Sequence, residues 1–117
     1  MNSTRPASTV IVINHNGMGR AETELSHKLA AAFLNMLDLD GKLPRTICFY
    51  AEGVKLAIEG SPVLEELRSL ADKGVELLVC TTCLNYYQAL DELAVGTAGG
   101  MKDIVQRQWD AQKVITI

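Results

Sequence analysis

Short apolar runs rich in β-branched residues recur along the chain and predict strands. The first is Val-Ile-Val-Ile at residues 10–13, and it runs directly into polar residues and a glycine. This pattern is typical of a strand that is buried on both faces and ends in a turn. By the same reasoning, we predict further strands at residues 46–50, 75–79, 94–97 and 114–117.

Apolar residues at helical spacing fill the segments between these strands. Between residues 21 and 37, four apolar side chains recur at every fourth position, which predicts a helix packed on a sheet. These side chains are Leu25, Leu29, Phe33 and Leu37. Ser61 before Pro62 is typical of a helix start, and we expect this second helix to end at Lys73 and Gly74.

Three more helical segments are predicted from the remaining stretches. One is short and lies within residues 51–59, and the next two cover residues 84–90 and 101–110. A turn at residues 98–100 precedes the last helix. We expect the apolar face of that helix to consist of Met101, Ile104, Val105 and Trp109.

This alternation of strands and helices predicts an α/β fold. We expect a single doubly wound, mostly parallel sheet of about five strands, with helices on both faces and right-handed crossovers. The 117 residues fit one domain spanning residues 1–117, with residues 1–8 as a flexible N-terminus.

Composition and charge argue against some partners and indicate a compartment. The net charge of −3 gives no electrostatic reason to expect binding to nucleic acid or to an anionic membrane. The apolar runs are far shorter than the roughly 20 residues of a membrane helix, and the N-terminus does not resemble a signal peptide. Three cysteines are an odd number for a disulfide framework, so we expect a cytoplasmic protein.

Two unusual segments follow strands, at residues 14–20 and 80–83. In an open α/β sheet the loops at the carboxyl ends of the strands meet at one edge, where the next helices also begin. If Thr81 or Thr82 caps the following helix, Cys83 lies in its first turn and Cys80 just outside it. Unpaired N–H groups there favour a thiolate, which is the nucleophile that sulfur transfer requires.

A persulfide on one of these cysteines is also anionic near neutral pH, so the same N–H groups suit the loaded form. The second cysteine can attack the persulfide, release its outer sulfur and leave a Cys80–Cys83 disulfide. The other interpretation is that both cysteines are small apolar fillers at a strand end, which is common for free cysteine. Cys48 lies inside a predicted strand, and we expect it to be buried and inert.

The loop at residues 14–20 supplies supporting candidates, of which Asn14 is the first. Its glycines lack the spacing of a nucleotide-binding loop, so a plain tight turn is favoured, although Arg20 can attract an anionic sulfur species. His15 would lie near Cys80 if the first and third strands were neighbours, as a base or a metal ligand, or else as a solvated loop side chain. No fourth zinc ligand is evident, so we expect no metal and no other cofactor. Met18 lies beside glycines, where it can line a pocket.

The strand-to-helix junction at residues 75–87, Val-Glu-Leu-Leu-Val-Cys-Thr-Thr-Cys-Leu-Asn-Tyr-Tyr, resembles the DsrE/DsrF-like superfamily. The likeness is greatest to the C-terminal domain of YedF-type sulfurtransferase-like proteins linked to selenium metabolism. It extends through Met18-Gly-Arg20, Ala32-Phe-Leu-Asn35, Phe49-Tyr50, Glu59-Gly-Ser-Pro-Val-Leu64 and Leu93-Ala-Val-Gly96. The loop at residues 14–17 departs from the serine- and aspartate-rich version expected there.

The resemblance implies a Rossmann-like sheet, cytoplasmic sulfur or selenium handling, and a homo-oligomer, either a trimer or a hexamer. It also implies that Cys80 bears a persulfide and that Cys83 is the assisting or resolving thiol. YedF-type proteins carry an N-terminal TusA-like domain that these 117 residues do not include, so separate sulfur donor and acceptor proteins are expected. A thiol–disulfide redox or sensor module and a non-catalytic oligomeric scaffold remain the alternatives.

Overall fold

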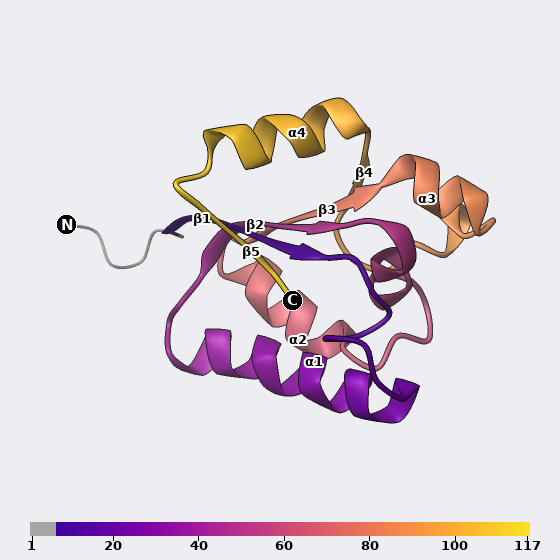
Figure 1. Ribbon diagram of the computed structural model, residues 1–117, viewed down its shortest axis with the longest axis horizontal. Helices are drawn as coiled ribbons and strands as arrows, with labels where there is room; N and C mark the ends of the chain where they lie inside the picture. Colours follow the sequence, from indigo (N-terminus) through magenta and orange to yellow (C-terminus); the bar gives the residue numbers. More distant parts are fainter. Residues whose placement is uncertain (1–6) are drawn as a thin grey trace.

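Strands and helices alternate along residues 7–117, the part of the chain that the computed structural model describes (Figure 1). The strands are β1 (Ala7–Ile13), β2 (Pro44–Phe49), β3 (Glu76–Cys80), β4 (Thr97–Gly99) and β5 (Lys113–Thr116). The α-helices are α1 (Thr23–Leu39), α2 (Leu64–Asp72), α3 (Thr81–Tyr86) and α4 (Met101–Asp110). Two 3₁₀ helices, η1 (Ala51–Ala57) and η2 (Leu90–Glu92), lie in the connections.

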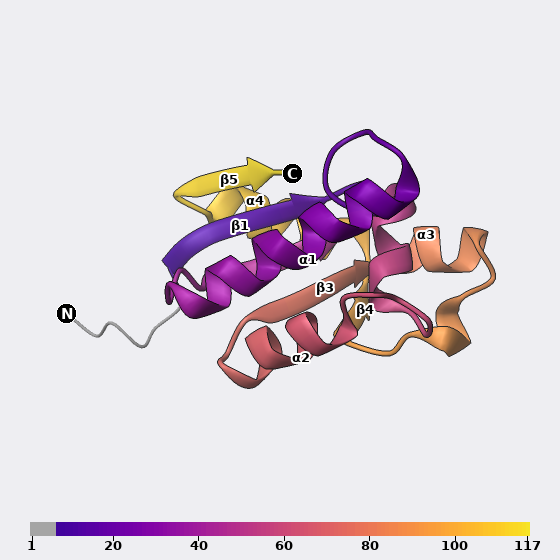
Figure 2. The ribbon, with the colours of Figure 1, turned by 90° about the horizontal axis from the view of Figure 1, so that it is seen from below.

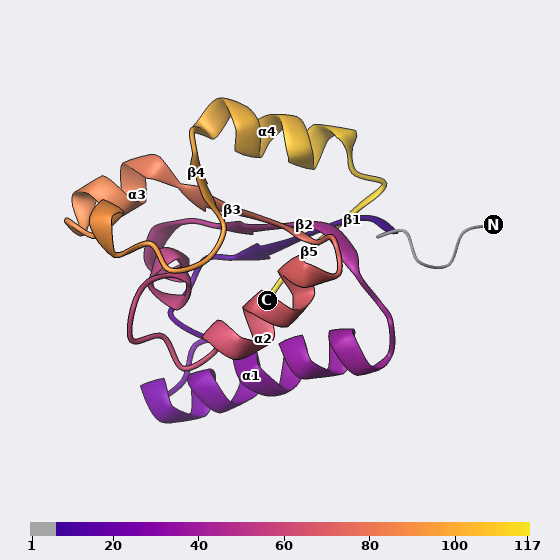
Figure 3. The ribbon, with the colours of Figure 1, turned by 180° about the vertical axis from the view of Figure 1, so that it is seen from behind.

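The five strands form one sheet in the order β4-β3-β2-β1-β5, and every neighbouring pair is parallel. Helices α1 and α2 cover one face, whereas α4 covers the other (Figures 1 and 3). The predicted α/β, doubly wound sheet is therefore confirmed. Because all strands are parallel, their carboxyl ends lie at the same edge, from which α3 extends (Figure 2).

The centre of the sheet forms the core. Val12 on β1, Cys48 on β2 and Leu78 on β3 are register partners on one face, and each is at most 4% exposed. β-branched and other apolar side chains suit strands that are covered on both faces. The core thereby holds the three central strands, and with them the edge where β3 ends, in a fixed arrangement.

Several predicted boundaries were wrong by a few residues. The first strand begins at Ala7, so residues 7 and 8 belong to the sheet, while residues 1–6 of the predicted flexible terminus lie outside the described part. The fourth strand lies at Thr97–Gly99 instead of residues 94–97, and it includes residues 98 and 99 of the predicted turn, because they pair with Val79 and Cys80 on β3. Helix α2 begins at Leu64 instead of residue 62, with the Ser61 hydroxyl accepting the N–H of Val63.

Two helices present faces other than those predicted. In α1 the buried side chains are Ser26, Ala30 and Leu34, whereas Leu25 and Leu29 are exposed. In α4, Ile104 alone of the predicted apolar face is buried, and Met101, Val105 and Trp109 are exposed. The apolar spacing identified both helices correctly, but each carries a second apolar stripe that faces away from the sheet.

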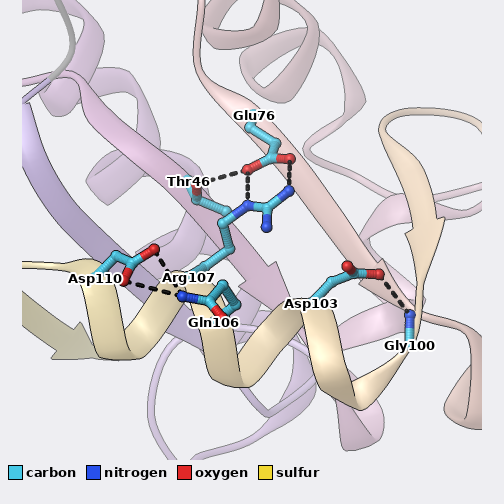
Figure 4. Close-up of polar contacts among 7 residues, drawn as sticks. All are labelled: Thr46, Glu76, Gly100, Asp103, Gln106, Arg107 and Asp110. Carbon is cyan, nitrogen blue, oxygen red and sulfur yellow. Dashed lines mark hydrogen bonds and ion pairs between the residues drawn. The ribbon is translucent and has the colours of Figure 1, made fainter.

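A polar cluster joins α4 to the sheet (Figure 4). The Arg107 guanidinium donates two hydrogen bonds to the Glu76 carboxylate, at 2.9 and 3.0 Å, and the buried Thr46 hydroxyl donates a third at 2.8 Å. These bonds, that of Arg107 above all, lower the pKa of Glu76. The cluster joins β2, β3 and α4 at the amino end of β3.

No helix within residues 7–117 is long and apolar enough to cross a membrane.

Candidate thiol site at the carboxyl edge of the sheet

Two cysteines lie together where β3 passes into α3. Cys80 is the last residue of β3, and Cys83 lies in the first turn of α3, which starts at Thr81. Their side chains lie close enough together for Cys80 to raise the pKa of the Cys83 thiol. Cys80 is only 1% exposed, whereas Cys83 is half-buried. The pair therefore consists of one enclosed sulfur and one sulfur that solvent reaches.

The local structure of this junction differs from the prediction in its helix start. The helix begins at Thr81 instead of residue 84, so Cys80 takes the N-cap position and neither Thr81 nor Thr82 caps it. Cys80 has extended backbone angles, φ −64° and ψ 117°, which continue the strand up to the first helical residue. With no loop between the two elements, the helix projects directly from the strand and holds Cys83 one turn beyond Cys80.

The environment of Cys83 favours the protonated thiol. Burial raises the pKa of Cys83, and the hydrogen bond with Cys80 raises it further, while the N–H of Ala51 acts in the opposite direction. The proposed thiolate character at the helix start is thus wrong for Cys83. A proton kept on Cys83 can be donated to the Cys80 sulfur, so the two thiols do not have equal roles.

The segment η1 covers this site from the neighbouring strand. The backbone N–H of Ala51 points at the Cys83 sulfur, with a nitrogen–sulfur distance of 3.2 Å. Ala51 adopts φ +51°, a left-handed conformation that is uncommon for a residue with a side chain. Two residues later, Gly53 lies so close to β1 that a β-carbon there would overlap the carbonyl oxygen of Ile13. Packing of Gly53 against β1 therefore fixes where the N–H of Ala51 points.

Two charged side chains of η1 and two tyrosines at the end of α3 lie near one another. The Lys55 ammonium lies 4.7 Å from the centre of the Tyr87 ring and 3.2 Å from the carboxylate of Glu52. Tyr87 is half-buried and Tyr86 is exposed, and their rings meet edge to face. The sequence did not reveal these contributions of η1. Gly53, placed shortly after a strand, was the available signal, because glycine in that position permits a close backbone approach.

The loop between β1 and α1 holds the other predicted site residues. His15 accepts a 3.4 Å contact from Nε of the exposed Arg20, and Met18 is half-buried against the core. The side-chain oxygen of Asn14 is buried and accepts no hydrogen bond from residues 7–117. Since β2 lies between β1 and β3, the condition that would bring His15 beside Cys80 is not met.

This loop instead forms a separate open cavity of about 700 Å³. It is lined by His15, Asn16, Gly19, Arg20, Ala21, Thr23, Ser26 and Glu52. Glu52 belongs to η1 and directly follows Ala51, the residue that contacts Cys83. The cavity and the thiol pair are therefore separate sites, and consecutive residues of the short segment η1 take part in each.

The third cysteine is part of the core. Cys48 is fully buried in β2, and burial raises its pKa to about 11, so the prediction that it is a core residue is confirmed. Within residues 7–117 no group of three or more His, Cys, Asp or Glu side chains is arranged to hold a metal ion.

Comparison with family models decides the classification. The model of the DsrE/DsrF-like family matches residues 7–117. The chain belongs to the DsrE/DsrF-like family. This membership agrees with the resemblance seen at the strand-to-helix junction, and it covers every strand and helix described above. A search of curated proteins found no match.

Solved structures with the same fold include members from archaea and bacteria. A protein of unknown function from Methanobacterium thermoautotrophicum, MTH1491, superposes with a TM-score of 0.69 at 22% identity, covering 93% of this chain and 97% of that one. The ychN protein of E. coli gives 0.65 at 18% identity, with 93% and 98% coverage. BT1422 of Bacteroides thetaiotaomicron, also of unknown function, gives 0.68 at 14% identity, with 94% and 95% coverage. At these identities the similarity shows the fold.

Proposed function

We propose that this DsrE/DsrF-like chain is a sulfur-relay protein that carries a persulfide on Cys80, with Cys83 as the assisting thiol. The observation that carries the proposal is the placement of two cysteines one helical turn apart at the carboxyl edge of the sheet, where Cys80 is enclosed and Cys83 is half-buried. The resemblance to YedF-type C-terminal domains supports the same assignment and extends it to selenium as an alternative cargo. A reducing cytoplasm, which we propose as the compartment, would keep both thiols available.

The chemistry of loading and release balances with two external partners. A donor persulfide, R–S–SH, is attacked at its outer sulfur by the Cys80 thiolate, which gives Cys80–S–SH and the donor thiolate. An acceptor thiolate then attacks the outer sulfur of Cys80–S–SH and regenerates the Cys80 thiolate. Alternatively, the sulfur of Cys83 attacks the inner sulfur and its proton passes to the departing sulfide, which releases H₂S and leaves a Cys80–Cys83 disulfide that an external thiol must reduce.

The burial of Cys80 sets a requirement on loading. Because its side chain is 1% exposed, a donor sulfur reaches it only when the edge opens locally. The contact between Ala51 and Cys83 joins η1 to α3 at this point, and α3 has only six residues. We infer that separation of these two segments admits the donor, while their closed state protects a bound persulfide from solvent.

The test is intact-mass spectrometry of the native protein after incubation with inorganic polysulfide, followed by peptide mapping. We expect an added sulfur on Cys80 that mild thiol treatment removes. Labelling of the Cys80→Ser variant should be at least 20-fold lower than that of the wild type. Labelling of Cys48→Ser should equal that of the wild type, because Cys48 is enclosed in the core. Full labelling of Cys80→Ser would overturn the assignment of the carrier residue, and an unlabelled wild-type protein would overturn sulfur relay.

A thiol–disulfide redox or sensor module is the second candidate, and the same placement of the two cysteines favours it. This function needs a reversible Cys80–Cys83 disulfide with a potential in the cytosolic range, roughly −180 to −320 mV. Equilibration in glutathione buffers followed by mass analysis measures that potential. A disulfide that forms readily in a protein that polysulfide does not label would favour this function over the relay.

A non-catalytic scaffold is the third candidate, and it requires cysteines that are structural. The half-exposed Cys83 is the observation that opposes it, because a structural thiol gains nothing from contact with solvent. Resistance of both Cys80 and Cys83 to alkylation in the native protein would restore this interpretation.

A further inference from the structure

The open cavity of about 700 Å³ between the β1–α1 loop and η1 takes no part in the proposed sulfur chemistry, yet its volume is that of a small-molecule site. The loop arches beside the start of α1, at the end of the sheet from which α3 also extends (Figure 2). Two side chains of opposite charge line the cavity, Arg20 from the loop and Glu52 from η1. A cavity of this kind suits a ligand that carries both charges.

The guanidinium of Arg20 can offer its two terminal nitrogens to a ligand. Its Nε atom donates to Nε2 of His15 at 3.4 Å, which orients one edge of the group. The two terminal nitrogens form no hydrogen bond and no ion pair with residues 7–117. A free pair of guanidinium nitrogens matches the two oxygens of a carboxylate.

The start of α1 adds donors on the same side of the cavity. Thr23 is the first residue of this 17-residue helix, and it lines the cavity together with Ala21 and Arg20. Glu22, at the N-cap position, makes no side-chain cap hydrogen bond. The N–H groups of the first turn therefore lack an acceptor from that side chain, and a carboxylate on Arg20 would lie at the positive end of the helix dipole.

The carboxylate of Glu52 supplies the opposite charge. Lys55 contacts only its Oε2 atom, at 3.2 Å, so Oε1 has no partner among residues 7–117. The side chains of Lys55 and Glu52 are 35% and 55% exposed, and an exposed pair of this kind holds its members weakly. A ligand ammonium can therefore bind Oε1 while Lys55 stays in place.

The loop that forms one wall of the cavity is held firmly on α1. Gly17 adopts φ +143° and packs so closely that a β-carbon there would overlap the β-carbon of Ser26. The N–H of Met18 donates to the carbonyl oxygen of Ser26 at 3.0 Å, and Ser26 is only 4% exposed. The wall is therefore formed before a ligand arrives, which lowers the entropic cost of binding.

We propose that this cavity binds a small molecule with a free α-amino-acid group, with the carboxylate on Arg20 and the ammonium on Glu52. An anion without the ammonium would face the Glu52 carboxylate unpaired, and a cation without the carboxylate would face Arg20 in the same way. The volume leaves room for the side chain of the amino acid as well. Binding of this ligand does not depend on the sulfur relay proposed for the cysteines.

The ligand would act on the thiol pair through η1. Glu52 directly follows Ala51, whose N–H lies 3.2 Å from the sulfur of Cys83. A ligand that joins Glu52 to Arg20 holds η1 against the β1–α1 loop, and so keeps η1 over Cys83. Because a ligand stabilises the state that it binds, occupancy of the cavity should slow the reactions of the Cys83 thiol.

Isothermal titration calorimetry of the full chain with S-methyl-L-cysteine tests the binding, since the blocked sulfur of this probe cannot react with the thiols. We expect Arg20→Gln and Glu52→Gln each to raise the dissociation constant about 10-fold or more. Arg68→Gln and Glu65→Gln are the matched controls, because they make the same charge changes at exposed positions of α2, outside the cavity. Circular dichroism checks that all four variants fold. Absence of saturable binding to the wild type, or an equal loss in the controls, would overturn the site.

Two analogues of the probe, each without one charge, test the zwitterion assignment. 3-(Methylthio)propanoate lacks the ammonium and 2-(methylthio)ethylamine lacks the carboxylate. We expect both to bind the wild type about 10-fold more weakly than the probe. Glu52→Gln should not weaken the propanoate further, nor Arg20→Gln the amine, because the interaction is already missing. Propanoate or amine binding as tight as that of the probe would overturn the assignment.

Alkylation by iodoacetamide tests the effect on the thiol. At a saturating concentration of the probe, we expect Cys83 to react roughly 3-fold more slowly or less in the wild type, and at an unchanged rate in Glu52→Gln. A wild-type rate that the bound probe does not change would overturn the connection through η1. Polysulfide labelling of Cys80 is measured without the probe, so a failure of the relay would leave these results unaffected.

Discussion

Cys48 and Cys80 lie on adjacent strands, on the same face of the sheet, and both are at most 1% exposed. They differ in their position along the strand. Cys48 is surrounded by core residues in β2, whereas Cys80 ends β3 and has a second thiol one helical turn away. Burial alone therefore does not distinguish Cys48 from Cys80, the cysteine that we propose as the sulfur carrier. What distinguishes them is the carboxyl edge, where a new helix and a neighbouring segment bring further groups to the sulfur.

The largest expected difference between the two regions is in alkylation. With a pKa near 11 and no exposed surface, Cys48 has about one thiolate in a thousand molecules at pH 8, and that thiolate is enclosed. We expect iodoacetamide to modify Cys83 first and Cys48 at least 100-fold more slowly, as followed by peptide mapping. In urea all three cysteines should react alike. Equal alkylation rates for Cys48 and Cys83 in the folded protein would show that the core and the carboxyl edge do not differ in thiol reactivity.

A second prediction concerns the segment that covers the edge. Gly53→Ala places a β-carbon against the carbonyl oxygen of Ile13, so η1 must move away from β1. We expect a loss of about 2–4 kcal/mol in the free energy of unfolding, measured by urea denaturation. Alkylation of Cys83 should also accelerate, because η1 then covers the thiol less, and we expect this gain in access to outweigh the loss of the Ala51 N–H, which lowers the pKa of Cys83.

Gly100→Ala is the control for this substitution. Gly100 has open space around the β-carbon position and no left-handed φ. The free energy of unfolding of Gly100→Ala should therefore fall by less than about 1 kcal/mol. A Gly53→Ala variant as stable as Gly100→Ala would show that η1 is not held by its contact with β1.

The fold was predictable because its signals are local and repeated. The β-branched run of β1 and the spacing of α1 identify their elements without any knowledge of the partners they pack against. The buried and exposed sides of α1 were not predictable, because Leu25 and Leu29 satisfy the same spacing on a different side of the helix. Two apolar stripes on one helix produce a pattern that only the packed structure can resolve.

The candidate site was predictable in its cysteines and not in its surroundings. Cys80 and Cys83 follow a buried strand, and that position alone placed them at the edge. The contact from Ala51 depends on a left-handed φ at an alanine and on the closeness of Gly53 to β1, which no local pattern encodes. The separation of His15 from Cys80 depends on strand order, and β2 lies between the strands that carry them.

A third prediction is that substitution of Cys48 lowers the stability of the protein without changing its polysulfide labelling. Cys48→Ser replaces a thiol with a hydroxyl that is fully buried in β2. A buried hydroxyl without a partner costs about 1–3 kcal/mol, which we expect as a loss in the free energy of unfolding. Cys48→Ala, which introduces no polar group, distinguishes this cost from that of lost volume. If Cys48→Ser reduced polysulfide labelling as strongly as Cys80→Ser, the distinction between core and edge would be wrong.

The smallest effect is expected at the polar cluster that anchors α4. Arg107→Gln removes two hydrogen bonds to Glu76, and we expect a loss of about 1 kcal/mol at pH 7, a modest value because the two side chains are 33% and 38% exposed. Since Arg107 lowers the pKa of Glu76 below its usual 4.5, its contribution is fully present above pH 4.5 and is lost as the pH falls through the lower folded-state value.

The difference between wild type and Arg107→Gln should therefore narrow in that acidic range, as measured by urea denaturation at several pH values. Lys102→Gln, on the exposed side of α4, makes the same change in net charge without touching Glu76. The pKa of Asp38 is also lowered, mainly by its hydrogen bond from Lys73, but this effect is the same in all three proteins and cancels from the difference. A difference that stays constant down to pH 3 would mean that Arg107 acts through packing of its side chain instead of through the Glu76 carboxylate.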